Sequence, residues 1–126
     1  HIGIFVKNLK VGESFFSKNF NIKRVSKTIT DKNLKVKIKF LYDYNNICYE
    51  LVAPFGKKNP VDKVIKIKSR ILNHIAYTTN HFDKTIQEMR KKNFAPISKP
   101  MIAKAFNRRV IFFLTPLNFI IELIEK

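Results

Sequence analysis

The sequence predicts an α+β fold assembled from two copies of one module. Residues 46–51 and 118–123 match in register at their Asn, Glu and Leu positions. Upstream, Phe40-Leu41 is matched with Phe113-Leu114, so the turns that follow differ in length by one residue. Each copy has the pattern of a strand, a helix and three further strands. Because each module is too small to bury its own sheet, we expect the two to pack into one curved sheet with helices outside.

The first module is expected over residues 1–54. It begins with a buried strand at residues 1–6, and Asn8 then caps a helix. Helical spacing predicts that the buried face of this helix consists of Val11, Phe15 and Phe16. Apolar residues alternate or cluster between turn residues in the rest of the module, which predicts strands at residues 21–30, 34–42 and 47–53.

A joint at residues 55–71 leads into the second module, expected over residues 72–126. Pro60 suits the first turn of a short helix in the joint that ends at residue 67. In the second module, Asn80 is expected to cap a helix. Helical spacing predicts that its buried face consists of Phe82, Ile86 and Met89. A loop is expected at residues 98–107, and strands at residues 72–78, 94–97, 109–115 and 118–125.

Composition limits the class of protein. With 126 residues, 45% of them hydrophobic, the chain is expected to be globular. No run of 18 apolar residues and no signal-peptide pattern occurs, and the single Cys48 cannot form an intrachain disulfide, so we expect a cytoplasmic protein. The net charge of +16 is spread along the chain, which favours an anionic small-molecule substrate over nucleic acid or a membrane.

Two His–Glu pairs are the candidate site. Glu122 lies alone in an apolar strand, where a buried carboxylate needs a partner. His1 and Glu50 open and close the first module, and His74 and Glu122 open and close the second at nearly the same separation in sequence. The residue two positions after each His is small. Two nitrogen and two oxygen donors would suit a divalent ion such as Zn, Ni, Co, Fe or Mn.

Taken singly, each of these residues has a simpler interpretation. His1 could be an exposed chain end, His74 a hydrogen-bonded core histidine, and Glu50 a surface acid on an edge strand. The matched spacing favours a metal site. His81 has no counterpart in the first module and is expected at the surface.

The chain resembles the vicinal oxygen chelate superfamily, which includes glyoxalase I, methylmalonyl-CoA epimerase, extradiol dioxygenases and antibiotic-binding proteins. The resemblance covers essentially the whole chain and is carried by residues 1–7, 50–54, 73–76, 107–114 and 121–123. It implies a single domain of residues 1–126 with a cupped, eight-stranded mixed sheet of two βαβββ modules around a metal. A homodimer is also implied. The site could form within one chain or across two.

Within the superfamily, the ligand set His1, Glu50, His74 and Glu122 resembles that of bacterial glyoxalase I. It implies one divalent ion, with Ni, Zn or Co preferred. Methylmalonyl-CoA epimerases usually have Gln at the position of Glu50. They also have a further acid on the third strand, where this chain has Lys37, Ile38 and Lys39. Conversely, the Arg that anchors glutathione in glyoxalase I is Phe5 here, and the joint and the Asn107-Arg108 turn are similar to those of epimerases.

The resemblance implies a metal-dependent isomerase of glyoxalase I (lactoylglutathione lyase) type, with proton transfer next to a carbonyl through an enediolate. Glu122 is the expected base and Glu50 acts on the opposite side. The alternatives are an epimerase of an acyl-CoA or carrier-protein thioester and a non-catalytic small-molecule-binding protein. The side chains that could hold an anionic thiol carrier are Lys57, Lys58, Arg70, Lys99, Arg108 and Arg109.

Overall fold

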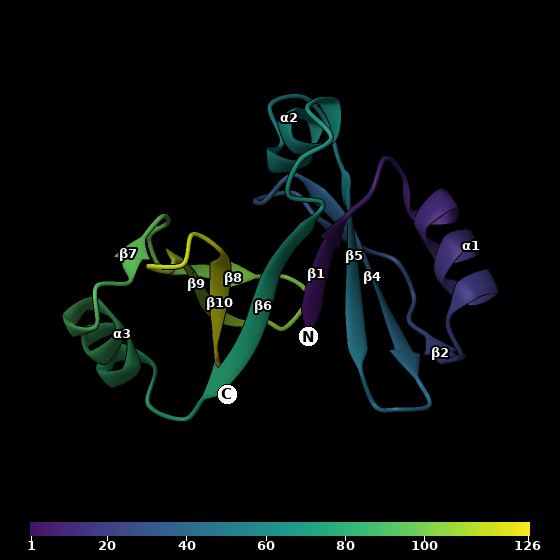
Figure 1. Ribbon diagram of the computed structural model, residues 1–126. Coiled ribbons are helices and arrows are strands. Elements are labelled where there is room, and N and C mark those ends of the chain that lie inside the picture. The colour runs from purple at the N-terminus through teal and green to yellow at the C-terminus, as the bar shows by residue number, and fades with distance from the viewer. The chain divides into compact units, whose positions relative to one another are not determined.

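The computed structural model describes residues 1–126 and contains three helices and ten strands (Figure 1). The chain divides into two compact units, residues 1–73 and 74–126, which are described in turn. The predicted α+β fold of two strand–helix–strand modules is confirmed. None of the three helices has the length and hydrophobicity needed to span a bilayer.

The first unit contains a mixed sheet with strand order β2-β4-β5-β1. β1 runs parallel to β5, and the other pairs are antiparallel. β2 and β3 pair with successive parts of β4, so together they fill the one strand position predicted at residues 21–30. The elements are β1 (Ile2–Phe5), α1 (Leu9–Asn19), β2 (Ile22–Val25), β3 (Ile29–Asp31), β4 (Val36–Asp43), β5 (Cys48–Pro54) and α2 (Pro60–Lys66).

Helix α1 covers one face of this sheet. Asn8 caps it as predicted, accepting a hydrogen bond from the backbone N–H of Val11 at 2.9 Å. The contact with the sheet is made by Phe16, which packs in a core cluster with Leu41, Tyr49 and Leu51. Gly12 lies one turn earlier, on the same side of the helix, where a Cβ would come within 2.9 Å of Val6 Cγ1.

The predicted burial of Val11 and Phe15 is wrong, because these side chains are 59% and 55% exposed. Helical periodicity aligns Gly12 with Phe16. The helix therefore approaches the sheet through its smallest residue, and the larger apolar residues one position earlier are turned away. An expectation based on hydrophobic size alone misses this close approach.

The face of the sheet opposite α1 is set by strand register. Glu50 pairs with Phe40 of β4 and with Gly3 of β1, and Val52 pairs with Ile38. Residues that are paired across strands point to the same side of a sheet. We call this surface, which carries Phe40, Glu50, Val52 and Ile38, the Glu50 face.

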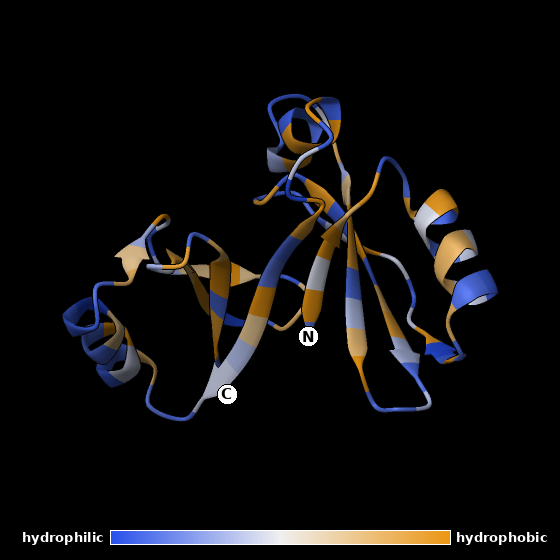
Figure 2. Cartoon of the chain, viewed as in Figure 1, coloured by the Kyte–Doolittle hydropathy of each residue, from blue (hydrophilic) through white to orange (hydrophobic).

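The second unit repeats this plan with strand order β6-β10-β9-β7. β10 runs parallel to β6 and antiparallel to β9. β7 and β8 pair with successive parts of β9, as β2 and β3 do with β4. The elements are β6 (Leu72–Thr79), α3 (Phe82–Lys91), β7 (Ala95–Pro96), β8 (Met101–Ala103), β9 (Arg108–Leu114) and β10 (Ile120–Glu125). Figure 2 shows hydrophobic residues concentrated in the strands and hydrophilic ones in the turn between β6 and α3.

The loop predicted at residues 98–107 is partly wrong, since it contains β8. So short a strand does not show a period in the sequence. What stabilises β8 is its antiparallel pairing with Arg108 to Val110 of β9. The connecting turn places Asn107 at a φ of 52°, a conformation that Asn tolerates.

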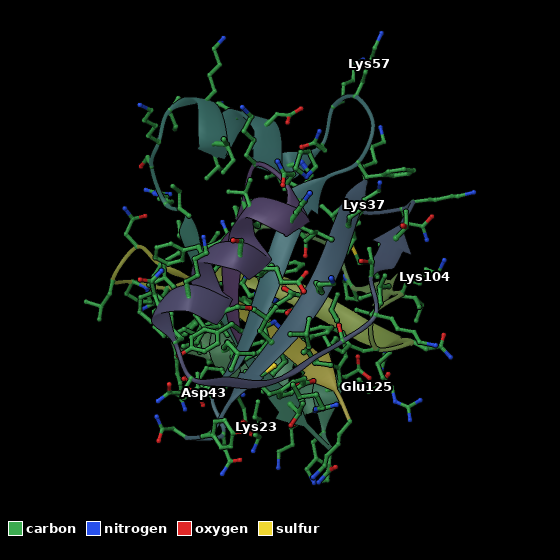
Figure 3. All side chains as sticks on the ribbon, turned by 90° about the vertical axis from the view of Figure 1, so that its right-hand side faces the viewer. Lys23, Lys37, Asp43, Lys57, Lys104 and Glu125 are labelled. Atoms are coloured by element: carbon green, nitrogen blue, oxygen red, sulfur yellow. The ribbon has the colours of Figure 1, made fainter.

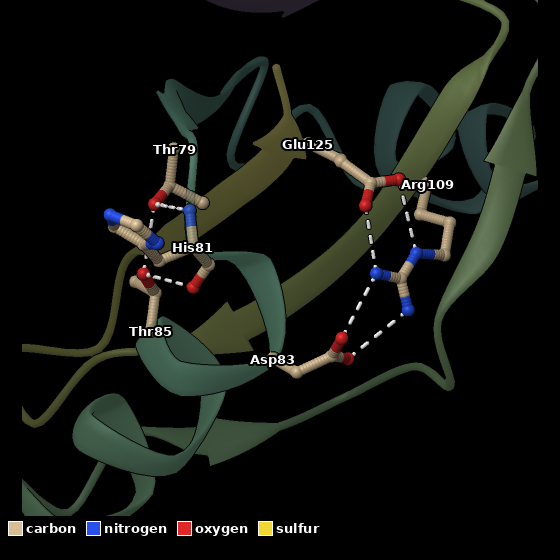
Figure 4. A network of polar contacts seen from close by, with 6 residues as sticks. All are labelled: Thr79, His81, Asp83, Thr85, Arg109 and Glu125. Atoms are coloured by element: carbon tan, nitrogen blue, oxygen red, sulfur yellow. Dashed lines mark hydrogen bonds and ion pairs between the residues drawn. The ribbon is translucent and has the colours of Figure 1, made fainter.

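Helix α3 packs as predicted, with Phe82 and Ile86 buried and Met89 packed against the same cluster. The predicted Asn80 cap is wrong. The hydroxyl of Thr79 accepts the hydrogen bond from the His81 N–H at 3.1 Å and lies 2.9 Å from the Thr85 hydroxyl (Figure 4). A hydroxyl at the end of β6 therefore fixes the first turn of the helix.

The internal repeat is visible in the hydrogen bonds. The Ser26 hydroxyl accepts from the Phe40 N–H at 2.9 Å, and the Ser98 hydroxyl accepts from the Phe112 N–H at 3.0 Å. The turns that follow are also equivalent, with Asn46 and Asn118 at φ values of 63° and 66°. Phe40 thus corresponds to Phe112 and not to Phe113. The predicted alignment was wrong by one residue, and the two turns have the same length.

Candidate metal centre

The first unit holds one of the predicted His–Glu pairs. Glu50 lies in the middle of β5, and His1 immediately precedes β1, the parallel neighbour of β5. Nε2 of His1 is 3.4 Å from Oε2 of Glu50, and the two side chains are 6% and 5% exposed. The Phe40 ring packs edge-on against the imidazole with 5.8 Å between ring centroids.

The second unit holds the other pair in the same construction. Glu122 lies in β10 opposite Ala76 of β6, and His74 is two residues earlier on β6. Nε2 of His74 is 3.5 Å from Oε2 of Glu122, and both side chains are 4% exposed. The Phe112 ring packs edge-on against His74, also at 5.8 Å. Each unit therefore presents one imidazole and one carboxylate beside a phenylalanine ring.

The distances within these pairs suit two ligands of one metal ion. They exceed the roughly 2.7–3.2 Å of a good N–H···O hydrogen bond. Ligand atoms about 2.1 Å from an ion are about 3.0 Å apart at a right angle and about 3.4 Å apart at a tetrahedral angle. Imidazole nitrogen with carboxylate oxygen is also a donor set that zinc, nickel and cobalt accept. Each pair could thus occupy two coordination positions of one divalent ion.

Strand β4 places no acid on the Glu50 face. Ile38 lies on this face and is 4% exposed. Lys37 and Lys39 alternate to the opposite face, where Lys39 forms an ion pair with Glu13 of α1. Phe5 is buried beside Val52 on the Glu50 face. On the Glu50 face, strand β4 therefore offers no carboxylate for proton transfer, because its one acid, Asp43, alternates to the other face.

A polar row at one end of the Glu50 face was missed by the sequence analysis. Tyr42 pairs with Arg24 on one side and with Cys48 on the other. The Arg24 guanidinium carbon lies 3.8 Å from the centroid of the Tyr42 ring. Burial raises the pKa of the Tyr42 hydroxyl and of the Cys48 thiol, so both are neutral near pH 7. Arg24 carries no signal in the sequence because it is one of many basic residues.

The basic residues proposed to hold a thiol carrier differ in their surroundings. Arg109 hydrogen-bonds to Asp83 and Glu125 and packs over the Phe82 ring at 4.7 Å (Figure 4). It ties α3 to the sheet and is not available to a substrate. The remaining five are exposed, and Lys57 extends away from the ribbon (Figure 3); they are Lys57, Lys58, Arg70, Lys99 and Arg108. His81 is exposed at the start of α3, as predicted.

The fold and the repeated His–Glu pairs define a class of two-module α+β proteins with internally duplicated donor sets. The model of the Glyoxalase/Bleomycin resistance protein/Dioxygenase superfamily matches residues 1–112. The chain belongs to this superfamily, which confirms the resemblance inferred from the sequence. No curated protein sequence matches the chain closely enough to count as a relative.

Solved structures share this fold along the whole chain. A hypothetical protein from Bacillus halodurans is 25% identical with a TM-score of 0.84, covering 100% of this chain and 91% of its own. The methylmalonyl-CoA epimerase of Mycobacterium tuberculosis is 18% identical with a TM-score of 0.83, and the match covers 99% of this chain and 85% of the epimerase. A methylmalonyl-CoA epimerase in complex with methylmalonyl-CoA and NH4+ is 20% identical with a TM-score of 0.80, and the match covers 100% of this chain and 92% of the epimerase.

Proposed function

We propose that the protein is a metal-dependent isomerase that moves a proton on a carbon next to a carbonyl, with glyoxalase I type as the first candidate. The two His–Glu pairs would together hold one divalent ion, with nickel, cobalt or zinc preferred. The observation that carries this proposal is the identical pair in each unit, at 3.4 Å and 3.5 Å, with all four side chains buried. The convergence of the pairs on one ion is a prediction from the sequence repeat.

The chemistry of such a site follows from its donors. A bound divalent ion supplies Lewis-acid stabilisation of negative charge on a substrate oxygen. Glu122 removes the proton from the carbon, and Glu50 acts on the opposite side. The rings of Phe40 and Phe112, packed beside the two histidines, exclude water from the reacting carbon.

For a hemithioacetal the reaction is an internal rearrangement. The proton on the carbon that bears the hydroxyl and the sulfur is removed, and a proton is returned to the neighbouring carbonyl carbon. The product is a 2-hydroxyacyl thioester with the same atoms as the substrate, so no external oxidant is required. This assignment uses Glu50 and Glu122 as the proton-transfer groups, which agrees with the absence of an acid from the part of β4 on the Glu50 face.

An epimerase of an acyl-CoA or carrier-protein thioester is the second candidate. Two observations favour it: the likeness in fold to methylmalonyl-CoA epimerases along the whole chain, and Phe5 in place of the Arg that would anchor glutathione. The basic residues around α2 could then hold the anionic carrier. Ile38 on β4 opposes it, because that strand provides no acid on the Glu50 face. The presence of all four donors opposes a role as a non-catalytic binder.

A paired assay on metal-reconstituted protein separates these candidates. Protein loaded with nickel, cobalt or zinc is given methylglyoxal with glutathione in one arm. In the other arm it is given methylmalonyl-CoA in deuterated water. Formation of the lactoyl thioester supports the glyoxalase I type, and exchange of the α-proton without it supports the epimerase. Failure of both reactions with every metal would contradict the assignment as an isomerase of this kind.

A further inference from the structure

The polar row on the Glu50 face lies close to the proposed reaction centre. Arg24, Tyr42 and Cys48 are register partners on three neighbouring strands, so their side chains share the side that carries Glu50. Cys48 is two residues before Glu50 on β5. Two residues of a strand span about 7 Å, which places the row within the length of a small substrate from Glu50.

Arg24 offers an uncommitted positive charge in a defined orientation. None of the ion pairs in the structure involves Arg24, whereas Lys39 and Arg109 each contact a carboxylate. Its guanidinium lies over the Tyr42 ring at 3.8 Å. A stacked guanidinium is partly freed of water and keeps its edge available for two parallel hydrogen bonds to a carboxylate or a phosphate.

The internal repeat shows that folding does not require this row. At the equivalent register positions of the second unit, the counterparts of Arg24, Tyr42 and Cys48 are Ala95, Leu114 and Ile120. In the same sheets the repeat preserves the Ser–Phe hydrogen bond and the Glu of each pair. The two units thus share the groups that hold the strands together. They differ at one end of the Glu50 face, which is polar and cationic in the first unit, whereas the equivalent positions of the second unit are apolar.

We propose that Arg24, oriented by Tyr42, binds an anionic group of the substrate, a carboxylate or a phosphate a few bonds from the reacting carbon. This inference rests on the proposed function, because that function places the reacting carbon at Glu50. Arg24 then determines which substrates are accepted and which way round they bind. Its role is positioning and recognition, and the proton transfer remains with Glu50 and Glu122.

The test compares three hydroxamates on the intact, cobalt-loaded protein. They share one chelating head and differ in the tail: butyrohydroxamate is neutral, succinic monohydroxamate carries a carboxylate, and 3-phosphonopropionohydroxamate carries a phosphonate. Affinities are measured by calorimetry and by the visible spectrum of the cobalt. We expect at least one anionic compound to bind about 10-fold or more tightly than the neutral one, as charge-assisted hydrogen bonds of this kind allow.

Variants assign this preference to a residue. Arg24→Gln should abolish the preference for the anionic tail and leave the affinity of butyrohydroxamate unchanged. Tyr42→Ala should weaken the preference, and Tyr42→Leu, which installs the residue of the second unit, should do the same. Arg90→Gln is the matched control, since it removes one exposed arginine of α3 and should keep the preference.

The outcomes separate this inference from the proposed function. Binding of cobalt and butyrohydroxamate tests the function, and the difference between tails tests Arg24. Equal affinity for all three compounds in the unmodified protein would overturn the Arg24 assignment, as would a preference that survives Arg24→Gln. Absence of any cobalt binding would overturn both. The relative affinities of the carboxylate and the phosphonate identify which anion is recognised.

Discussion

Glu122 is a carboxylate between apolar residues in the middle of β10, and its position next to His74 makes it a candidate metal ligand. The same arrangement occurs at Glu50 with His1, and phenylalanine rings cover both imidazoles. These four residues could be identified as a candidate site from the sequence, because their spacing repeats in the two modules. Arg24 could not be predicted, because its significance depends on strand register and on its contact with Tyr42.

Replacement of Glu122 by Gln tests its role in proton transfer. Gln has nearly the same shape but cannot accept the proton, so we expect turnover to fall by about 100-fold or more. The measurement is the rate of the active arm of the paired assay, with the fold checked by circular dichroism. Glu13→Gln is the matched control, because Glu13 pairs with Lys39 on the α1 face. Equal losses in the two variants would contradict a specific role for Glu122.

The elements were predicted where local patterns are long, and missed where they depend on distant partners. The helices and the central strands follow from periodicity and from residues that begin helices, such as Asn8 and Pro60. The strand β8 was missed because it is stabilised by β9, and the orientation of α1 was missed because Gly12 makes the closest approach to the sheet. Both errors arise from tertiary contacts that a local pattern does not contain.

The close approach of α1 predicts that Gly12→Leu is destabilising. A Cβ at Gly12 would lie 2.9 Å from Val6 Cγ1 and 3.1 Å from Leu51 Cδ1. Overpacking of this kind costs about 1–3 kcal/mol of unfolding free energy, which urea denaturation would measure. Ser17→Leu, on the exposed side of the same helix, should have little effect. A Gly12→Leu protein as stable as the unmodified one would show that α1 can move away from the sheet without cost.

The Arg109 network predicts a pH-dependent contribution to stability. The hydrogen bonds from Arg109 lower the pKa of Glu125, so the unfolded state binds a proton at higher pH than the folded state. The stabilisation is present above the ordinary glutamate pKa of about 4.3 and is lost as the pH falls through the lowered value. We expect Arg109→Met to lower the melting temperature at pH 7, with the difference shrinking as the pH falls through this range. A difference independent of pH would assign the effect to the packing of Arg109 on Phe82.

At the scale of the whole molecule, duplication explains both the fold and the candidate site. Each unit repeats the strand order, the hydrogen bond from a phenylalanine N–H to a serine hydroxyl, and the His–Glu pair. The sequence showed the period of the repeat but aligned Phe40 with Phe113, because the Phe-Leu dipeptides look alike. The hydrogen bonds from the Phe40 and Phe112 N–H groups to the Ser26 and Ser98 hydroxyls correct this alignment to Phe112.

The repeat predicts equal and additive effects of two serine substitutions. Ser26→Ala and Ser98→Ala each remove the acceptor of one strand N–H, which should cost about 1 kcal/mol of unfolding free energy. The two hydrogen bonds share no residue, so the double variant should lose the sum of the single effects. Denaturant unfolding of the three variants measures this. Unequal single effects would show that the two bonds are not equivalent.

The central claim is that the two His–Glu pairs together bind one metal ion, and cobalt stoichiometry tests it most directly. Titration of the metal-free protein with cobalt, followed by visible absorption and by analysis of bound metal, should give one ion per chain. Glu50→Ala and Glu122→Ala should each weaken this single site, because each removes one ligand of the same ion. Two ions per chain, or a site that keeps its affinity after loss of either carboxylate, would contradict the account.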